Sequence, residues 1–264
     1  MPKISACVIS FNDEHTIAWS VASVRFVDEI VVVDTGSTDR TIDIAEQLGA
    51  RVVRAEPFAG FGTMRNKAME HCANDWVFSL DADEHCTREL EAEIKALFAG
   101  EPPHDAYYIR RNNYLMGRWI RGSGWHLDHR TPQLYRKSCF RYTASTSHES
   151  HELLSDKPVG RLTSTLWHLP FSNLDEILYK ANLYSTLGAK AQAKTGAPVS
   201  MWSALGHGLW TFFRLYVVKR GFIDGWAGFI IALSNFEGTF YRYAKRYEIQ
   251  QGWGAPPEQP PGKS

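Results

Sequence analysis

Short apolar runs alternate with segments of helical periodicity through the first third of the chain. The apolar runs predict short strands, and the segments between them predict helices. The strands are expected at residues 4–9, 29–33, 49–54 and 76–80, and the helices at 16–24, in a segment ending at Leu48, and at 61–72. Strands and helices that alternate across short loops are typical of a doubly wound, mainly parallel sheet.

Acidic residues end the fourth apolar run. Residues 76–80 read as a strand buried on both faces, and Asp81, Ala82, Asp83 and Glu84 follow it directly. Such a strand delivers its first polar residues to the carboxyl edge of the sheet, where α/β proteins bind ligands. Two aspartates one residue apart cannot both stay ionised cheaply, and a hard divalent cation that also binds phosphates resolves the repulsion. We therefore interpret Asp81 and Asp83 as a metal-diphosphate site.

The residues after Asp81 do not fit two common acidic motifs. An EF-hand loop beginning at Asp81 requires Gly at its sixth position and Glu at its twelfth, where the chain has Cys86 and Ala92. A phosphatase that forms an aspartyl-phosphate requires Thr where the chain has His85. The alternative that stays open is a polar strand end whose acids cap the helix beginning near Thr87.

Composition limits the classes of function. With 264 residues, 44% of them hydrophobic, the chain can bury a full core in one large or two small domains, and its formal net charge of +0 argues against a general nucleic-acid binder. No signal peptide is recognised, and the longest apolar run, residues 226–233, is far shorter than the roughly 20 residues of a spanning helix. The cysteines lack metal-ligand spacing and are expected to be free thiols in a reducing cytosol. They are Cys7, Cys72, Cys86 and Cys139.

Polar residues also follow the first two predicted strands. Ser10, Asn12 and Glu14 follow the first, and Asp34 follows the second, where an acid can hydrogen-bond a ribose hydroxyl or a base N–H. Helix capping is the alternative role for Asn12, and Ser37 or its neighbour Thr38 is expected to cap the next helix. The glycine-rich phosphate loops of dinucleotide and ATP sites are missing, so a diphosphate must rely on metal and side chains.

Four ordered motifs carry a family resemblance. They are residues 6–14, 33–39, 64–68 and 80–84, within a similarity that runs from about Lys3 to Tyr247. The chain resembles the family 2 glycosyltransferases, and within them it is most similar to bacterial lipopolysaccharide-core beta-glucosyltransferases. The resemblance implies an α/β GT-A fold, a Rossmann-like, mainly parallel mixed sheet flanked by helices, with C-terminal amphipathic helices.

The same resemblance implies roles for particular residues. It implies a UDP-sugar donor held by Mn²⁺ or Mg²⁺, with Asp81 and Asp83 as the paired acids, Asp34 at the uridine and Arg65 near the diphosphate. His168 is placed like the third metal ligand of some GT-A enzymes, and a purely structural histidine is the alternative. The nucleotide-sugar-binding residues are expected to be Ser10, Asn12, Glu14, Asp34, Arg65, Asp81, Ala82 and Asp83.

The middle of the chain is expected to bind the acceptor. A strand at 106–110 precedes an irregular stretch at 112–130, rich in Gly and Trp, and a strand at 131–136 returns to the sheet. Long aromatic loops are uncommon unless they bind something, so the stretch is a candidate lid, although its aromatic residues can also pack beneath it. The candidate acceptor-binding residues are Trp125, Asp128 and Arg136.

An inverting sugar transfer needs a carboxylate that takes the proton of the acceptor hydroxyl. The chain offers two His-Glu pairs, ending at Glu149 and Glu152, and either resembles the pair found in the family. We prefer Glu152 because the two leucines that follow it fit the family better, and we keep Glu149 as the second choice. A solvated loop in which neither glutamate is the base is the alternative.

The chain becomes helical after Pro170. Helices are expected at 174–194, with Ser172 as the cap, from residue 203 onward, and again after a turn at 221–225. Six Lys or Arg against three acids lie between Ser200 and Glu248, which suits peripheral binding to a membrane, and packing on the catalytic domain or in a dimer is the alternative. The membrane-facing side chains are expected to be Trp210, Phe212, Phe213, Trp226, Phe229 and Ile230.

These observations predict a domain plan and a function. A GT-A catalytic domain is expected at 1–170, with a nucleotide-sugar half at about 1–100 and an acceptor half at about 101–170, followed by helices at 171–250 and a disordered tail at 251–264. The expected activity is inverting, metal-dependent transfer of a hexose, in first place glucose, from a UDP-sugar to a lipid-linked glycan such as the lipopolysaccharide core. The enzyme is expected in the cytoplasm, peripheral on the inner face of the membrane. The alternatives are a polyprenyl-phosphate glycosyltransferase of the same fold and a non-catalytic carbohydrate-binding protein.

Overall fold

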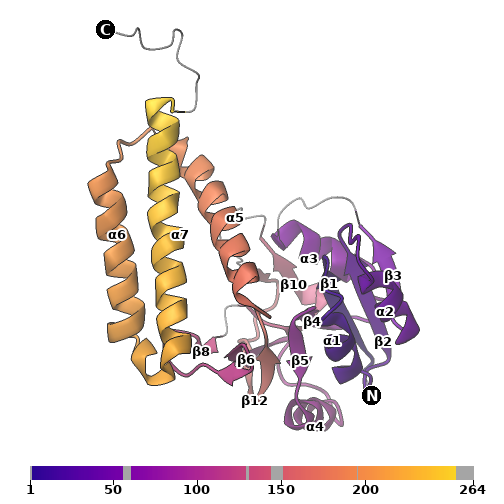
Figure 1. Ribbon diagram of the computed structural model, residues 1–264. Helices are drawn as coiled ribbons and strands as arrows, with labels where there is room; N and C mark the ends of the chain where they lie inside the picture. The colour runs from indigo at the N-terminus through magenta and orange to yellow at the C-terminus, as the bar shows by residue number, and fades with distance from the viewer. Residues whose placement is uncertain (1, 56–60, 129–130, 144–150, 195, 254–264) are drawn as a thin grey trace, which may run out of the picture. The chain divides into compact units, whose positions relative to one another are not determined.

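The chain forms two compact units in a computed structural model that describes residues 2–55, 61–128, 131–143, 151–194 and 196–253 (Figure 1). The first, which we call the sheet unit, comprises Met1–Tyr114 and Leu127–Pro170. The second, which we call the helical unit, comprises Leu115–His126 and Phe171–Ser264. The expected tail at 251–264 lies largely outside the described residues.

A mixed, mainly parallel sheet organises the sheet unit. Its strands lie in the order β3-β2-β1-β4-β9-β6-β12-β5, with β3, β2, β1 and β4 paired in parallel and β9 antiparallel to both neighbours. This confirms the predicted α/β fold class. The strands are β1 (Ile4–Ser10), β2 (Glu29–Asp34), β3 (Arg51–Arg54), β4 (Trp76–Asp81), β5 (Glu84–Cys86), β6 (Ala106–Leu115), β9 (Leu134–Arg136) and β12 (Gly160–His168).

Shorter elements complete this part of the chain. A separate antiparallel ribbon pairs β10 with β11. The short strands and the 3-10 turn are β7 (Arg118–Trp119), β8 (His126–Asp128), η1 (Lys137–Cys139), β10 (Phe140–Tyr142) and β11 (His151–Leu153). The helices are α1 (Ile17–Ser23), α2 (Thr41–Gln47), α3 (Phe61–Glu70) and α4 (Arg88–Leu97).

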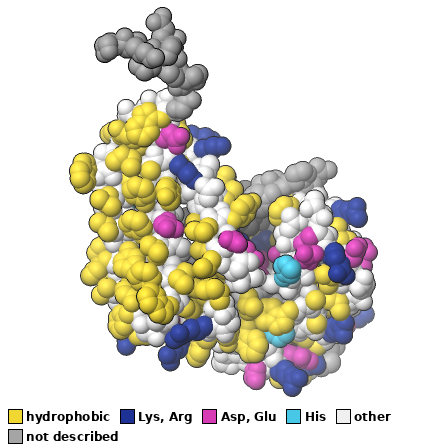
Figure 2. Space-filling model, viewed as in Figure 1, with side chains coloured by type: hydrophobic (Ala, Val, Ile, Leu, Met, Phe, Trp, Pro, Cys, Tyr) yellow, Lys and Arg dark blue, Asp and Glu magenta, His cyan; other side chains and the backbone are white. Residues whose placement is uncertain are grey.

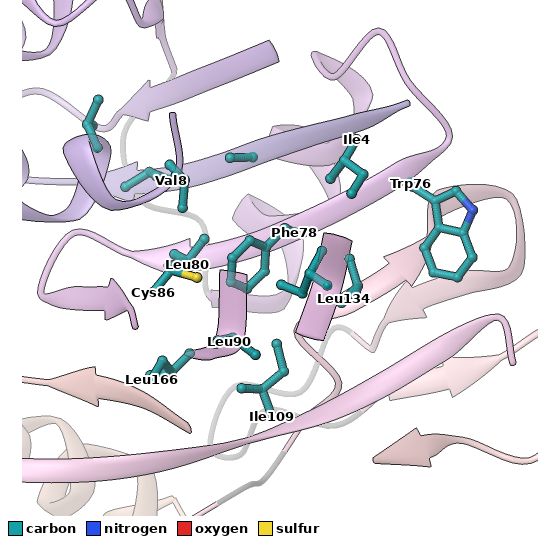
Figure 3. Close-up of a cluster of buried hydrophobic side chains, with 14 of the residues drawn as sticks. Ile4, Val8, Trp76, Phe78, Leu80, Cys86, Leu90, Ile109, Leu134 and Leu166 are labelled. Atoms are coloured by element: carbon teal, nitrogen blue, oxygen red, sulfur yellow. The ribbon is translucent and has the colours of Figure 1, made fainter. Parts of the chain in front are cut away.

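The core lies on the central strands because their sequences are apolar on both faces. Val8 of β1 and Phe78 and Leu80 of β4 are all 0% exposed. They gather with Leu90 of α4 and Ile109 of β6 (Figure 3). Each such side chain contributes roughly 1.5–3 kcal/mol by leaving water. Strand β4 is therefore anchored in the core, and the acids at its carboxyl end start from a rigid base.

One sequence expectation is wrong in this part of the chain, and one alternative is not supported. The stretch at 112–130 is not irregular throughout, because β6 continues to Leu115 and carries a buried Asn113 that polar patterning had assigned to a loop. Thr87 caps α4 by accepting a hydrogen bond from the Leu90 N–H at 3.2 Å, so Asp81 and Asp83 do not serve as its cap.

Caps also differ at two other helices. The residue before α2 is Arg40, without a side-chain cap, and the Ser37 hydroxyl donates to Asp34 instead. At the start of α5, Asn173 rather than Ser172 accepts the Glu176 N–H, at 2.9 Å.

The helical unit is built on α7, which lies between α5 and α6 (Figure 1). No helix in the described ranges combines the length and the hydropathy needed to cross a bilayer. The elements are α5 (Leu174–Ala193), α6 (Met201–Phe213), a π-helical turn η2 (Arg214–Val218), a 3-10 turn η3 (Gly221–Asp224) and α7 (Trp226–Gln251).

A buried aspartate ties residues 115–126 into the helical unit. Asp224 is 1% exposed, and its Oδ2 accepts the Gly122 N–H at 2.6 Å and the Arg121 N–H at 3.1 Å. Leu115 and Ile120 pack in the same apolar cluster as Ile231 of α7. The segment expected to be a lid is thus bonded to η3 along its backbone.

Gly228 provides a test of the close approach between α7 and η3. A Cβ atom on Gly228 would lie 1.9 Å from the Gly221 carbonyl oxygen, so Gly228→Ala should lower the free energy of unfolding by about 1–3 kcal/mol. Gly238 in the same helix has open space around it, and Gly238→Ala should raise that free energy by roughly 0.5–1 kcal/mol. Urea titration of both variants gives the comparison, and equal shifts would contradict the packing described.

Candidate functional site

A fully buried glutamate fixes the carboxyl edge of β4. Glu84 is 0% exposed, and its Oε2 accepts the Asp81 backbone N–H at 3.0 Å and the Gln133 Nε2–H at 2.9 Å. Its Oε1 lies 2.6 Å from Nε of Arg111. Burial raises the pKa of Glu84, and the Arg111 charge opposes that shift. Contacts to both carboxylate oxygens hold the turn between β4 and β5 in one geometry.

Asp81 is paired with a cation of the protein itself. Nη2 of Arg65, on α3, lies 2.7 Å from Oδ1 of Asp81, and Nη1 of Arg65 donates to the Ser79 hydroxyl at 3.2 Å. Burial would raise the pKa of Asp81, but Arg65 and then Arg111 outweigh it and hold the pKa below its ordinary value. Asp81 is therefore an ionised carboxylate already neutralised by Arg65.

Asp83 is the acid of the pair with unused bonding capacity. Its Oδ1 is buried, has no hydrogen-bond partner within the described part of the chain, and lies 3.6 Å from Nε2 of His168. Nδ1 of His168 lies 2.6 Å from Oδ1 of Asn113, an acceptor, so Nδ1 carries a proton and Nε2 faces Asp83. Burial lowers the pKa of His168, but the Asp83 carboxylate outweighs it and raises the pKa above its ordinary value.

Asp83 and His168 fit a divalent cation. A buried carboxylate oxygen that accepts no hydrogen bond from the described residues, beside an imidazole whose other nitrogen is fixed by an amide, is a donor set that such ions use. The three expected metal ligands, Asp81, Asp83 and His168, are not brought together, because Asp81 pairs with Arg65. Among the residues that the structure describes, no group of three or more His, Cys, Asp or Glu side chains could hold a metal. The protein would thus supply two ligands, and phosphate oxygens and water the others.

Asp34 organises the loop that follows β2. Its Oδ1 accepts the backbone N–H groups of Gly36 at 3.0 Å and Ser37 at 2.9 Å. Its Oδ2 accepts the hydroxyls of Ser10 at 3.3 Å and of Ser37. A carboxylate has about four acceptor positions. All of them are used within the protein.

Beside Asp34 lies a cavity of about 310 Å³. This volume is at the lower end of the range for ligand pockets. It is lined by Asp34, Gly36, Ser37, Ile42, Arg54 and Ala55.

Asn12 and Glu14 join the loops after β1 and β2. Oδ1 of Asn12 accepts the Thr38 N–H at 2.8 Å, and Oε2 of Glu14 accepts the Arg40 N–H at 3.3 Å. Asn12 has a φ of 55°, a left-handed conformation that asparagine tolerates better than most residues. Both side chains therefore serve to hold one loop to the other.

Helix α3 also connects this edge to the β10–β11 ribbon. Asn66, next to Arg65, donates from Nδ2 to the Tyr142 carbonyl at 2.7 Å and accepts the Tyr142 N–H at 2.9 Å. Glu152 is exposed on β11, paired with Arg141 of β10. The second candidate base, Glu149, lies outside the described residues.

Arg136 is not at this edge of the sheet. Strand β9 runs antiparallel to β4, so Arg136 lies opposite Trp76 at the start of β4, far along the strand from Asp81. Its Nε lies 3.2 Å from Oδ1 of Asp105. This placement gives no support to the assignment of Arg136 to acceptor binding, because only parallel strands bring their carboxyl ends to one edge, and the assignment stays a prediction.

The other acceptor candidates lie in different surroundings. Trp125 is half-buried in the helical unit and stacks on Phe171, with ring centroids 6.2 Å apart. Asp128 ends β8, and Ala82 is 3% exposed in the core of the sheet unit.

Sequence reasoning assigned no role to four residues that shape the site: Glu84, Arg111, Asn113 and Gln133. Arg111 and Asn113 are alternate residues of β6, so they point to the same face of the strand. The polar run at 110–113, at the end of the expected strand, was the available signal. The partners of these residues, however, come from other strands, and a local pattern does not reveal those.

Comparisons with known proteins agree on one family. Residues 5–159 match the family described as Glycosyl transferase family 2. The chain is 33% identical to an uncharacterized glycosyltransferase of Rickettsia felis, over 94% of this chain and 90% of that protein. It is 29% identical to the lipopolysaccharide core biosynthesis glycosyltransferase LpsC of Rhizobium meliloti, over 94% of each. The structure of S. aureus TarS 1-349 in complex with UDP matches with a TM-score of 0.50 and 16% identity, over 96% of this chain and 93% of that one, and supports the fold alone.

The pairing of Glu84 with Arg111 can be tested by stability. Arg111→Met leaves a buried carboxylate without its cation and should lower the free energy of unfolding by about 3–5 kcal/mol. The loss should shrink at acid pH, because the raised pKa of Glu84 allows it to become neutral. Lys95→Met, which removes the exposed partner of Glu91, should cost only about 0.3–0.5 kcal/mol. A loss as small as that of Lys95→Met would show that the buried pair does not hold the turn.

Proposed function

The chain belongs to glycosyl transferase family 2, and from this premise we propose that it is an inverting, metal-dependent hexosyltransferase. It moves a hexose from a UDP-sugar to a lipid-linked glycan such as the lipopolysaccharide core. Glucose is the first candidate for this hexose. The observation that carries the proposal is the buried Oδ1 of Asp83, which lacks a hydrogen-bond partner in the described ranges and faces His168. The name of LpsC supports the choice of acceptor, and the choice of donor rests on the family resemblance of the sequence motifs.

The donor is proposed to bind along the carboxyl edges of β1, β2 and β4. The cavity beside Asp34 has room for part of a nucleoside, and the tied loops around it are rigid before the donor arrives. Asp34 accepts hydrogen bonds from Ser10, Gly36 and Ser37, so its proposed role is to hold the wall of the pocket in place. Direct contact with the uridine would require the Ser37 hydroxyl to exchange its bond. Arg65, close to Asp81, supplies positive charge for the diphosphate.

Asp83 and His168 would hold the divalent cation. When bound, this ion supplies Lewis-acid stabilisation of the departing diphosphate. Asn113 keeps Nε2 of His168 turned toward Asp83, and Glu84 fixes the backbone at Asp81, so neither ligand has to reorganise.

Glu152 is proposed as the general base. The acceptor hydroxyl oxygen forms a bond to C1 of the donor sugar from the side opposite UDP, and the bond from C1 to the UDP oxygen breaks. The hydroxyl proton passes to the Glu152 carboxylate, which raises the nucleophilicity of the oxygen during the attack. Attack from the opposite side inverts the configuration at C1.

A lipid-linked acceptor locates the reaction at a bilayer. We propose that the protein works in the cytoplasm, peripheral on the inner face of the membrane, where such an acceptor presents its sugars. The LpsC relative supports this location through its role in core biosynthesis.

Asp83→Asn should separate metal use from folding. The amide cannot balance the charge of a cation, so binding of UDP in the presence of Mn²⁺ should fall to the level seen with EDTA, and transfer should be lost. Asp43→Asn, an exposed acid on α2, is the matched control and should leave both unchanged. Calorimetry and UDP release measure the two effects, and wild-type turnover that persists in EDTA would contradict the metal requirement.

Glu152→Gln should remove most acceptor-dependent turnover while donor affinity stays near that of the wild type. The expected loss is on the order of 10²- to 10⁴-fold, as for a missing general base. If Glu149→Gln shows this pattern instead, Glu149 is the base. If the double variant is as active as the wild type, an acceptor that needs no base, such as polyprenyl phosphate, is favoured. A wild type that turns over no UDP-, GDP- or dTDP-sugar would favour the non-catalytic alternative.

A further inference from the structure

Helices α6 and α7 pack against each other through one set of aromatic side chains. The Phe229 ring lies 5.6 Å from that of Phe212 and 5.8 Å from that of Tyr216. A Cβ atom on Gly208 would lie 2.9 Å from the Phe236 ring, which shows how closely the helices approach. Phe212, Phe229 and Ile230, expected from the sequence to face a membrane, are half-buried within the helical unit instead, and that expectation is corrected for these three residues.

A second set of large apolar side chains is left in water. Trp202, Trp210 and Trp226 are 82%, 58% and 78% exposed. Hydrophobic side chains gather over these helices with few charged ones among them (Figure 2). Exposed apolar patches of this kind mark interaction surfaces. We call the set the outer apolar surface; it comprises Trp202, Leu209, Trp210, Phe213, Val217, Val218, Phe222 and Trp226.

The spacing of these residues puts them on one side of α6. Residues 202, 209, 213 and 217 recur at helical intervals, and the rings of Trp210 and Phe213 lie 5.8 Å apart. Trp226 begins α7, and its ring lies 5.7 Å from Phe229, which contacts α6. The surface therefore continues from α6 across the connection to α7.

Basic residues flank this surface at the connection between the helices. Arg214, Lys219 and Arg220 are exposed there. The acid at this connection is Asp224, which is buried and accepts backbone N–H groups, and it is the only acid in the sequence from 201 to 236. The outer apolar surface thus ends in positive charge, and the only acid in the sequence from 201 to 236 is buried and bonded to backbone N–H groups.

We propose that the outer apolar surface docks on the headgroup region of a bilayer that contains anionic lipids. Tryptophan prefers the headgroup level, and basic residues beside an amphipathic face are attracted to anionic lipid. A second copy of the chain is a poorer occupant, because the surface offers no acid from 201 to 236 to receive the partner's basic residues. The inference deepens the membrane location proposed above, but it concerns lipid binding and can be tested without turnover.

Vesicle flotation of the full chain tests the proposal. The wild type should float with vesicles of phosphatidylglycerol and phosphatidylcholine at low salt, and the bound fraction should fall at high salt. Lys219→Gln with Arg220→Gln should weaken partitioning by about thirtyfold at low salt. Trp210→Ser with Trp226→Ser should weaken it by at least about tenfold at either salt concentration.

A matched control comes from α5. Leu187 is 54% exposed, outside the outer apolar surface, and Leu187→Ser should leave flotation unchanged. All variants alter exposed side chains, and equal melting temperatures would establish that they are folded. A wild type that stays unbound at low salt overturns the proposal, and so does a dimer that the tryptophan variants convert to monomer without any change in flotation. Failure of sugar transfer with intact flotation would count against the enzymatic proposal alone.

Discussion

The carboxylate of Glu84 is the contact on which the candidate site depends. It binds the backbone at the end of β4, the Gln133 side chain just before β9, and Arg111 in β6, so three strands meet at one buried charge. A buried carboxylate is stable only while its partners remain in place. The position of Asp81 and Asp83 is therefore set by the pairing of the sheet, and the turn that carries them does not have to define its own geometry.

From this fixed turn the two aspartates enter different environments. Asp81 meets Arg65 and is neutralised within the protein, whereas Asp83 meets His168 and keeps an oxygen free of hydrogen bonds among the described residues. The two carboxylates therefore differ in role. Asp81 is held in an ion pair within the protein, and Asp83 has an oxygen available to a cation. Arg65 and its neighbour Asn66 lie on one helix, and Asn66 bonds to β10, so the edge proposed to bind a diphosphate and the ribbon that carries the candidate base share one support.

The sequence predicts the features that depend on neighbouring residues, but not those that depend on pairing between distant segments. The strands at β1, β2 and β4 follow from local apolar runs, and the paired acids follow from their position after such a run. The direction of β9 is decided by its pairing with β4 and β6, which no local pattern encodes, and this sends Arg136 to the opposite edge. Asn113 was assigned to a loop because a local pattern does not reveal its partner: His168 lies on β12 and is distant in the sequence.

The loops after β1 and β2 show a second way in which polar residues near a ligand edge can act. Asn12, Glu14 and Asp34 were expected to reach a nucleotide, yet each accepts backbone N–H groups of the loop that follows β2. Polar side chains that satisfy one another fix the walls of a cavity before any ligand binds, which lowers the entropy lost on binding. These bonds hold the wall of the pocket in shape, and direct contact of the same residues with a nucleotide stays a prediction. Residue type alone could not reveal the supporting role, because Asn12 and Glu14 find their partners on a different loop.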